Sequence, residues 1–145
     1  SQTFLAVTLN YSPIEQIFRV MDATFRNVIE TGHGDKVNDI SRQTIDARSD
    51  LYALGATIYH LMTGRLPTDS LKRTLENWSG NSEVLPIPNA INPDIPPEIS
   101  AFLLKSMEID SANRFNSAKE MHQALRKAIA DVEQREDDAR KAIFW

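Results

Sequence analysis

The 145 residues include 16 lysines and arginines against 20 aspartates and glutamates, a formal net charge of -4 at pH 7. Because no basic cluster could follow a phosphate backbone, nucleic-acid binding is disfavoured. The absence of cysteine excludes disulfides, thiolate catalysis and cysteine-ligated zinc, and a hydrophobic fraction of 41% with 25% charged residues is typical of a globular domain.

The first helical periodicity follows residues 1–12, which carry no such period and predict an extended or looped entry. Pro13 suits the first turn of a helix, and apolar residues then recur at helical spacing up to Ile29. We therefore predict one helix over residues 13–30, ended by the stretch Thr-Gly-His-Gly, and a polar surface loop over residues 34–44.

The stretch from Asp46 to Gly64 is apolar almost all the way round between Leu51 and Met62. A helix that is hydrophobic on every side is either a membrane span or the buried axis of a helical core. About a dozen apolar residues fall short of the roughly 20 that a span needs. Since Asp46 can cap the start and Gly64 suits a left-handed exit, we predict a central buried helix over about residues 46–63.

Three more helices are predicted after the central one: a short helix over residues 71–78 that Ser70 or Asp69 can cap, a helix opened by Pro97, and a last helix opened by a capping box at residues 117–120. Residues 79–97 must be mostly irregular, because each of their prolines removes a backbone donor. Alternating acids and bases indicate a charged helical extension or linker over residues 131–145. No strand is signalled, so the predicted class is all-α.

Residue chemistry alone indicates no enzyme. The histidines, His33, His60 and His122, lie far apart and in no metal-ligand spacing, so no metal site is predicted. His60, one turn from the end of the central helix, is expected to serve packing or the helix dipole. No serine lies in a nucleophile-elbow pattern, and no carboxylates form a paired acid–base signature.

Three separated motifs, however, resemble one family in that family's order. Residues 46–67, Asp-Ala-Arg-Ser-Asp-Leu-Tyr-Ala-Leu-Gly followed by Tyr, Thr-Gly and Pro, resemble the central helix in the C-terminal lobe of protein kinases, in particular bacterial serine/threonine kinases of the eukaryotic type. Residues 8–16, Thr-Leu-Asn-Tyr-Ser-Pro-Ile-Glu-Gln, are similar to the end of a kinase activation segment, although Pro13 stands two residues before Glu15 instead of one. Residues 110–121, Asp-Ser-Ala-Asn-Arg-Phe-Asn-Ser-Ala-Lys-Glu-Met, resemble the turn between the last two helices of the lobe.

The resemblance implies an incomplete kinase fold, a helical C-lobe subdomain around one central helix. It divides the chain into the end of the activation segment with the substrate loop (1–16), an inserted amphipathic helix and loop (17–45), the helical core of the lobe (46–130) and the charged extension (131–145).

Residue roles implied by the resemblance are carried over position by position. Glu15 is expected to pair with Arg114 and tie the activation segment to the bottom of the lobe. Asp50 is expected to anchor the catalytic loop by accepting backbone hydrogen bonds, the alternative being an ordinary acid in a helix's first turn. Thr3 lies where activating phosphorylation often occurs, or is an ordinary loop threonine. The substrate loop comprises Thr8, Leu9, Asn10 and Tyr11.

The insertion over residues 17–45 has two interpretations. It is either a family insertion packed on the surface of the lobe, or a docking face for a substrate, a regulator or a second copy of the chain. The anchors of such a docking face would be Phe18, Met21, Phe25 and Ile29.

The resemblance also shows what this sequence lacks: a glycine-rich loop with an ATP-holding lysine, a catalytic aspartate loop and a magnesium-binding Asp-Phe-Gly, which would lie upstream of Ser1. We therefore expect a C-terminal fragment of a serine/threonine kinase that alone binds neither ATP nor Mg²⁺ and is inactive. The alternative is a natural half-kinase that acts as a non-catalytic interaction module.

Expected partners are a protein substrate or regulator, and also a second copy, since an isolated lobe would expose apolar surface on its central helix. We expect a cytoplasmic location and no membrane contact for this segment. A parent protein anchored in a membrane just after Trp145 is the remaining alternative for the apolar end of the chain.

Overall fold

The computed structural model describes residues 9–144, and every regular element in that range is helical. The all-α prediction is confirmed. The elements in chain order are α2 (Ile14–Val20), α3 (Ala23–Ser41), α4 (Ala47–Thr63), α5 (Ser70–Trp78), α6 (Pro88–Ile91), α7 (Pro97–Ser106), the 3-10 turn η1 (Ser111–Asn113) and α8 (Ala118–Phe144).

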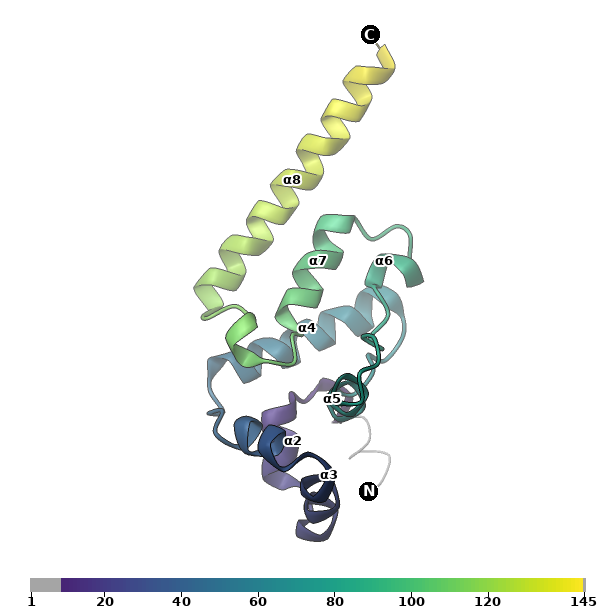
Figure 1. Ribbon diagram of the computed structural model, residues 1–145. Coiled ribbons are helices and arrows are strands. Elements are labelled where there is room, and N and C mark those ends of the chain that lie inside the picture. Colours follow the sequence, from purple (N-terminus) through teal and green to yellow (C-terminus); the bar gives the residue numbers. More distant parts are fainter. Residues whose placement is uncertain (1–8, 145) are drawn as a thin grey trace.

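Helix α4 crosses the middle of the molecule (Figure 1). Helices α6, α7 and α8 contact it on one side, and α2 packs with α3 and α5 on the other. The last half of α8 projects away from the rest of the structure (Figure 1). The predicted arrangement of helices around a central one is therefore what the structure has.

The ends of α4 follow from local signals. The Asp46 carboxylate accepts a hydrogen bond from the Arg48 N–H at 2.9 Å, and Gly64 ends the helix with φ 72°, a conformation that costs glycine nothing. One face of the helix differs from the prediction, because Leu54 is 48% and Leu61 78% exposed. The central helix is thus buried on most sides but not on all.

Helix α7 approaches α4 closely at Gly55. A Cβ built on Gly55 would overlap the Ser106 hydroxyl and lie 2.9 Å from the Ser106 Cβ. Ser106 is itself buried, and its hydroxyl donates to the Leu103 carbonyl at 2.7 Å. Glycine is therefore required here by packing between two helices and not by its backbone angles.

Gly55→Ala is expected to lower the free energy of unfolding by about 1–3 kcal/mol, because overpacking forces the two helices apart. Denaturant titration measures the loss. Gly32→Ala is the matched control, since a Cβ at Gly32 meets nothing within 4 Å. A Gly55→Ala variant as stable as the wild type would contradict this packing.

The single helix predicted over residues 13–30 is wrong. The chain turns at Met21 and Asp22, whose ψ angles of 139° and 137° are extended, and it forms two helices, α2 and α3. The Asp22 carboxylate caps α3, accepting from the Thr24 N–H at 2.8 Å. The helical spacing of apolar residues continues from α2 into α3 across Asp22, so the sequence pattern did not indicate that the chain forms two helices.

The surface loop predicted over residues 34–44 is also wrong, since α3 continues to Ser41. The two glycines expected to end the helix produce only a kink at His33, where φ is -144° and ψ 35°. Val37 and Ile40, beyond the kink, are buried in one cluster with Ile29. Tertiary packing therefore outweighs the low helix propensity of glycine.

The docking face proposed on the insertion is wrong for two of its four residues. Phe18 is 2% and Ile29 6% exposed, and both lie in the core that α2 and α3 form with α5. Met21 is half-buried against the same cluster, and only Phe25, at 49%, is substantially exposed. The alternative, an insertion packed onto the lobe, agrees with this burial.

The later elements begin at the predicted signals. Asp69 caps α5 by accepting from the Lys72 N–H at 2.8 Å, and Pro97 is the first residue of α7. The Ser117 hydroxyl accepts from the Glu120 N–H at 3.1 Å, which is half of the predicted capping box. Between α5 and α7 the one regular element is the single turn α6, and the charged segment after residue 131 is the helical end of α8.

Candidate functional site

The predicted substrate loop lies at the beginning of the described chain. Thr3 and Thr8 lie outside the described residues. Leu9, Asn10 and Tyr11 are helical, so the extended or looped entry predicted for residues 1–12 is wrong for these three. They lead into Pro13 and α2, which carries Glu15.

The loop is held by the end of α4 and the start of α5. The Asn10 amide donates to the Pro67 carbonyl at 2.7 Å. The Tyr11 hydroxyl forms a hydrogen bond of 2.5 Å with Nδ1 of His60. One residue further on, the Ser70 hydroxyl donates to the Ser12 carbonyl at 2.8 Å. Segments almost 60 residues apart in sequence are therefore joined here.

Glu15 and Arg114 form a fully buried ion pair. Nη1 of Arg114 donates to Oε1 of Glu15 at 2.6 Å and Nη2 to Oε2 at 3.1 Å, with both side chains 0% exposed. The Ser49 hydroxyl also donates to Oε1 at 2.9 Å. A planar guanidinium matches a carboxylate in this two-point geometry, so the structure brings these two predicted anchors together.

Arg114 extends the same network to three backbone carbonyls in two further segments. Its Nε donates to the Glu108 carbonyl at 2.6 Å, Nη2 to the Ile109 carbonyl at 3.0 Å and Nη1 to the Arg48 carbonyl at 3.3 Å. Its Cζ lies 4.9 Å from the centre of the Tyr52 ring. One side chain thus joins α2, the start of α4 and the segment between α7 and η1.

Asp50 lies on the exposed side of the first turn of α4. In the described part of the chain its carboxylate makes no hydrogen bond or ion pair. The structure therefore does not bring Asp50 together with the other two predicted anchors, and its role in holding a catalytic loop stays a prediction.

Arg73 on α5 forms a second buried network, which sequence reasoning missed. Its guanidinium donates to both oxygens of Glu83 at 2.9 and 3.0 Å, to the Tyr52 hydroxyl at 3.1 Å and to the Met107 carbonyl at 2.8 Å. Burial raises the pKa of Tyr52, although Arg73 acts in the opposite direction. No sequence signal distinguishes Arg73 from its exposed neighbour Lys72, because only the fold places one inside.

Glu83 is half-exposed. Burial alone would raise its pKa, but hydrogen bonds from Arg73 and from the Leu85 N–H outweigh burial and hold the pKa of this carboxyl below its ordinary value. Because the pKa is lower in the folded state, Glu83 stabilises the fold above its unfolded pKa of about 4.3, and this contribution is lost as the pH falls through the folded value.

Glu83→Gln is therefore expected to make the free energy of unfolding depend less on pH in the acidic range. The measurement is the denaturant midpoint of the wild type and the variant at a series of pH values from neutral to about pH 3. The stability difference between the two proteins should shrink as the pH falls below about 4. Two parallel profiles would contradict the assignment.

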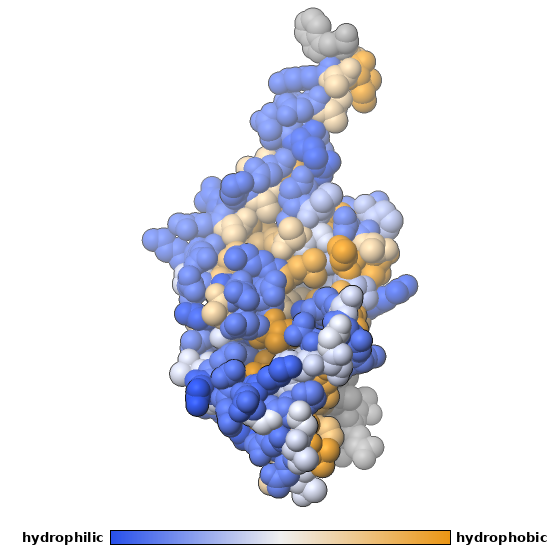
Figure 2. Space-filling model, in the orientation of Figure 1, coloured by the Kyte–Doolittle hydropathy of each residue, from blue (hydrophilic) through white to orange (hydrophobic). Residues whose placement is uncertain are grey.

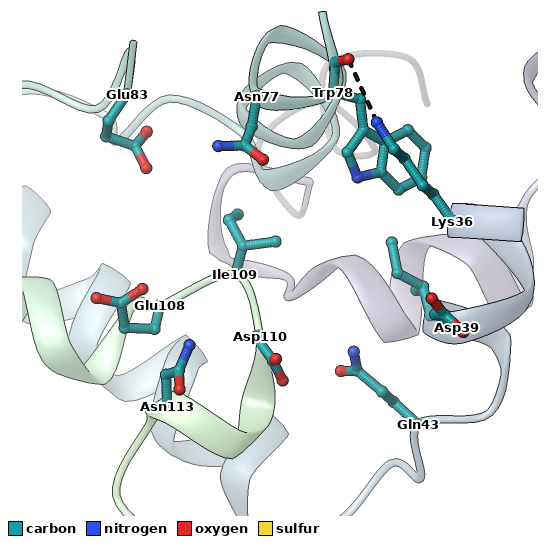
Figure 3. Close-up of a pocket in the computed structure, with 11 residues that line it drawn as sticks. Lys36, Asp39, Gln43, Asn77, Trp78, Glu83, Glu108, Ile109, Asp110 and Asn113 are labelled. Atoms are coloured by element: carbon teal, nitrogen blue, oxygen red, sulfur yellow. Dashed lines mark hydrogen bonds between the residues drawn. The ribbon is translucent and has the colours of Figure 1, made fainter. Parts of the chain in front are cut away.

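A polar hollow of about 500 Å³ lies between α3, α5 and the segment that leads into η1. Figure 3 shows Glu108, Asp110 and Asn113 on one side, with Lys36 and Trp78 across from them. Lys36 donates to the Trp78 carbonyl at 3.4 Å, the contact dashed in Figure 3. None of the predicted site residues lines this hollow, so it adds nothing to the substrate-loop site.

Neither a metal site nor a membrane span is found in the described chain. Among residues 9–144 no group of three or more histidine and carboxylate side chains is placed to hold a metal ion. Within the same range no helix is both long and apolar enough to cross a bilayer.

The structure is a helical lobe built around one central helix. A buried carboxylate–guanidinium pair joins its N-terminal segment to the turn before its last helix. The resemblance to a protein-kinase C-terminal lobe implies this arrangement. Known proteins point the same way. The chain is 32% identical over 89 residues to the serine/threonine-protein kinase PksC of Streptomyces coelicolor, covering 61% of this chain and 16% of that protein. It is 32% identical over 83 residues to PknB of Mycolicibacterium smegmatis, covering 57% and 13%.

The serine/threonine-protein kinase PrkC of Bacillus subtilis is 28% identical over 82 residues, 57% of this chain and 13% of that protein. No protein-family model matches the chain. The chain thus spans only a small fraction of the length of these relatives. With the all-helical fold, these matches confirm the similarity to the C-terminal lobe of bacterial serine/threonine protein kinases.

Proposed function

We propose that this chain is the substrate-binding and scaffolding part of a bacterial serine/threonine protein kinase, which as a whole transfers a phosphoryl group from ATP to serine or threonine in a protein. The buried pair of Glu15 and Arg114 carries the proposal. It couples the segment after Tyr11 to the core of the lobe, and a pure packing function would be served as well by apolar residues. In this proposal Thr8 to Tyr11 receive the substrate.

Asp50 supports the same proposal. Its carboxylate is exposed on α4 and unpaired within residues 9–144. In a complete kinase it would accept backbone hydrogen bonds from the catalytic loop. The residues that would hold ATP and Mg²⁺ are not in this sequence, so the chain alone would transfer no phosphate.

The test begins with the native protein, captured from its source cells with an antibody against this chain. Its intact mass and its ATP-dependent phosphorylation of serine or threonine in a protein substrate are then measured. The proposal is supported if the native species has a mass well above 16.4 kDa and phosphorylates the protein substrate. Asp50→Asn should then abolish this activity, and the exposed control Asp94→Asn should leave it unchanged. An inactive native species of 16.4 kDa would favour the half-kinase interaction module instead.

For the isolated chain, self-association is a further part of the proposal. The exposed Leu54 and Leu61 lie on one face of α4. Leu54 also borders an apolar hollow of about 170 Å³ between α4 and α8. Figure 2 shows a band of hydrophobic residues across the middle of the molecule. A second copy would remove such apolar surface from water.

Sedimentation velocity over a dilution series is expected to detect a concentration-dependent dimer. The double variant Leu54→Glu/Leu61→Glu should sediment as a monomer, because two buried charges would have to be desolvated in the interface. Val28→Glu is the matched control, since Val28 is an exposed apolar residue on α3. A compact wild-type monomer at every concentration would overturn self-association.

A further inference from the structure

The kink in α3 brings the two ends of that helix into contact. Nη2 of Arg26, near the start of α3, donates to the hydroxyl of Ser41, its last residue, at 2.7 Å. The two residues are 15 positions apart, a separation that would span about 22 Å in a straight helix. The contact therefore exists only because the chain bends at His33.

The same two residues line a cavity of about 250 Å³ between α2 and α3, together with Glu15, Phe18 and Arg19. Arg19 is exposed, and within residues 9–144 no carboxylate pairs with it. The Glu15 carboxylate is already compensated, because Arg114 donates to both of its oxygens. The cavity thus has surplus positive charge beside a hydroxyl group.

The other carboxylates nearby compete weakly for these cations. Nε of Arg26 donates to Glu30 at 3.0 Å, but the Glu30 side chain is 40% exposed, so water solvates much of its charge. Arg42, next to Ser41, is 81% exposed and lies 3.9 Å from Asp39. Its side chain can therefore turn toward Ser41 and add a third cation.

We propose that Ser41 is a phosphorylation site and that Arg19 and Arg26 bind the phosphate. A serine phosphate carries a charge of about −1.5 to −2 at neutral pH and three acceptor oxygens, and a guanidinium can donate to two such oxygens at once. This inference rests on the proposed function, because the native kinase supplies the phosphoryl transfer.

Ser41 is accessible for this reaction. It is exposed, and residues 42–46, which follow it, form no helix, so the last turn of α3 can unwind into a kinase active site. The Oγ atom of Ser41 forms a bond to the γ-phosphorus of ATP, and the bond from that phosphorus to the β–γ bridging oxygen breaks. ADP leaves, and the hydroxyl proton is released to water.

The phosphate would hold the kink of α3 closed. The C-terminal end of a helix disfavours negative charge, so the stabilisation has to come from the arginines. A phosphate bound by Arg19 and Arg26 would tie the end of α3 to its own start and to α2, the helix that carries Glu15. Phosphorylation at Ser41 would thereby stiffen the segment that follows the substrate loop.

The first test needs no kinase activity. Phosphoserine is incorporated at position 41 of the 145-residue chain during translation, and amide hydrogen exchange is compared with that of the unmodified chain. Exchange at residues 35–42 is expected to fall several-fold, up to about tenfold, because new charge-assisted hydrogen bonds oppose local opening.

Phosphoserine at position 79 is the matched control. Ser79 is also an exposed serine at the end of a helix, but its hydroxyl donates to the Leu75 carbonyl and contacts no arginine within residues 9–144. It should leave exchange in α3 unchanged. In an Arg26→Gln background, phosphoserine at position 41 should lose most of its effect. Equal effects at the two positions, faster exchange, or slowing that survives Arg26→Gln would each overturn the inference.

The second test uses the native protein incubated with ATP and Mg²⁺. Trypsin releases residues 37–42, in which Ser41 carries the one hydroxyl group, so a phosphoryl group on this peptide identifies the site. Ser41→Ala should remove that signal. A native kinase that phosphorylates a protein substrate but leaves residues 37–42 unmodified would overturn the inference. A native protein without phosphorylation activity contradicts the proposed function instead, and the exchange experiment still decides whether the cavity binds the phosphate.

Discussion

Glu15→Gln and Arg114→Met are each expected to lower the free energy of unfolding by about 3–5 kcal/mol, because either change leaves one member of a buried ion pair without its partner. Both side chains are 0% exposed, so water cannot replace the lost contact. Arg114→Met also frees three backbone carbonyls that now accept from it. Denaturant titration at low temperature is the measurement, since a loss of this size is a large part of a domain's stability.

The double variant Glu15→Leu/Arg114→Met keeps this prediction testable even where a single variant fails to fold. Replacing both charges with apolar groups removes the uncompensated charge, so the double variant should be more stable than the sum of the single losses implies. The partly exposed pair of Arg135 and Glu98, 2.7 Å apart, is the matched control. Glu98→Gln should leave the midpoint unchanged, and additive losses at Glu15 and Arg114 would contradict the assignment.

Arg73→Met is expected to lower the free energy of unfolding by about 2–4 kcal/mol. This is the size of the loss when hydrogen bonds to a charged group are removed and buried acceptors are left without a donor. The buried Met107 carbonyl loses its donor, and the Tyr52 hydroxyl loses its guanidinium partner. Arg73→Lys should recover only part of the loss, because an ammonium cannot reproduce a fork that contacts Glu83 at two points.

Denaturant midpoints measure this second effect as well. Lys72→Met is the matched control, since Lys72 is the adjacent but exposed cation on α5. It should leave the midpoint within experimental error. If Arg73→Met were as mild as the control, the network around Tyr52 would contribute nothing to stability, and Arg73 would be buried for another reason.

Much of the site was predictable because three motifs keep family order in the sequence. The pairing of Glu15 with Arg114 follows from that resemblance, and the structure places the two in contact. Arg73 could not be found in this way. It carries no motif, and a single residue along α5 separates the buried Arg73 from the exposed Lys72.

The sequence by itself determined where most helices begin and end. Asp46, Gly64, Asp69, Pro97 and Ser117 act within one helical turn of their own positions, so their effects can be read locally. The apolar content between residues 51 and 62 likewise determined the central helix, because a helix that is apolar on most sides, and too short to span a membrane, has to pack inside a helical core.

Only the tertiary structure decided the rest. It decided that α3 continues beyond His33, because burial of Val37 and Ile40 outweighs the cost of two glycines. It decided that Phe18 and Ile29 are core residues and not docking anchors, since helical spacing identifies an apolar face but not what covers it. It also placed His60 beside Tyr11, a contact across 49 residues that no local pattern encodes.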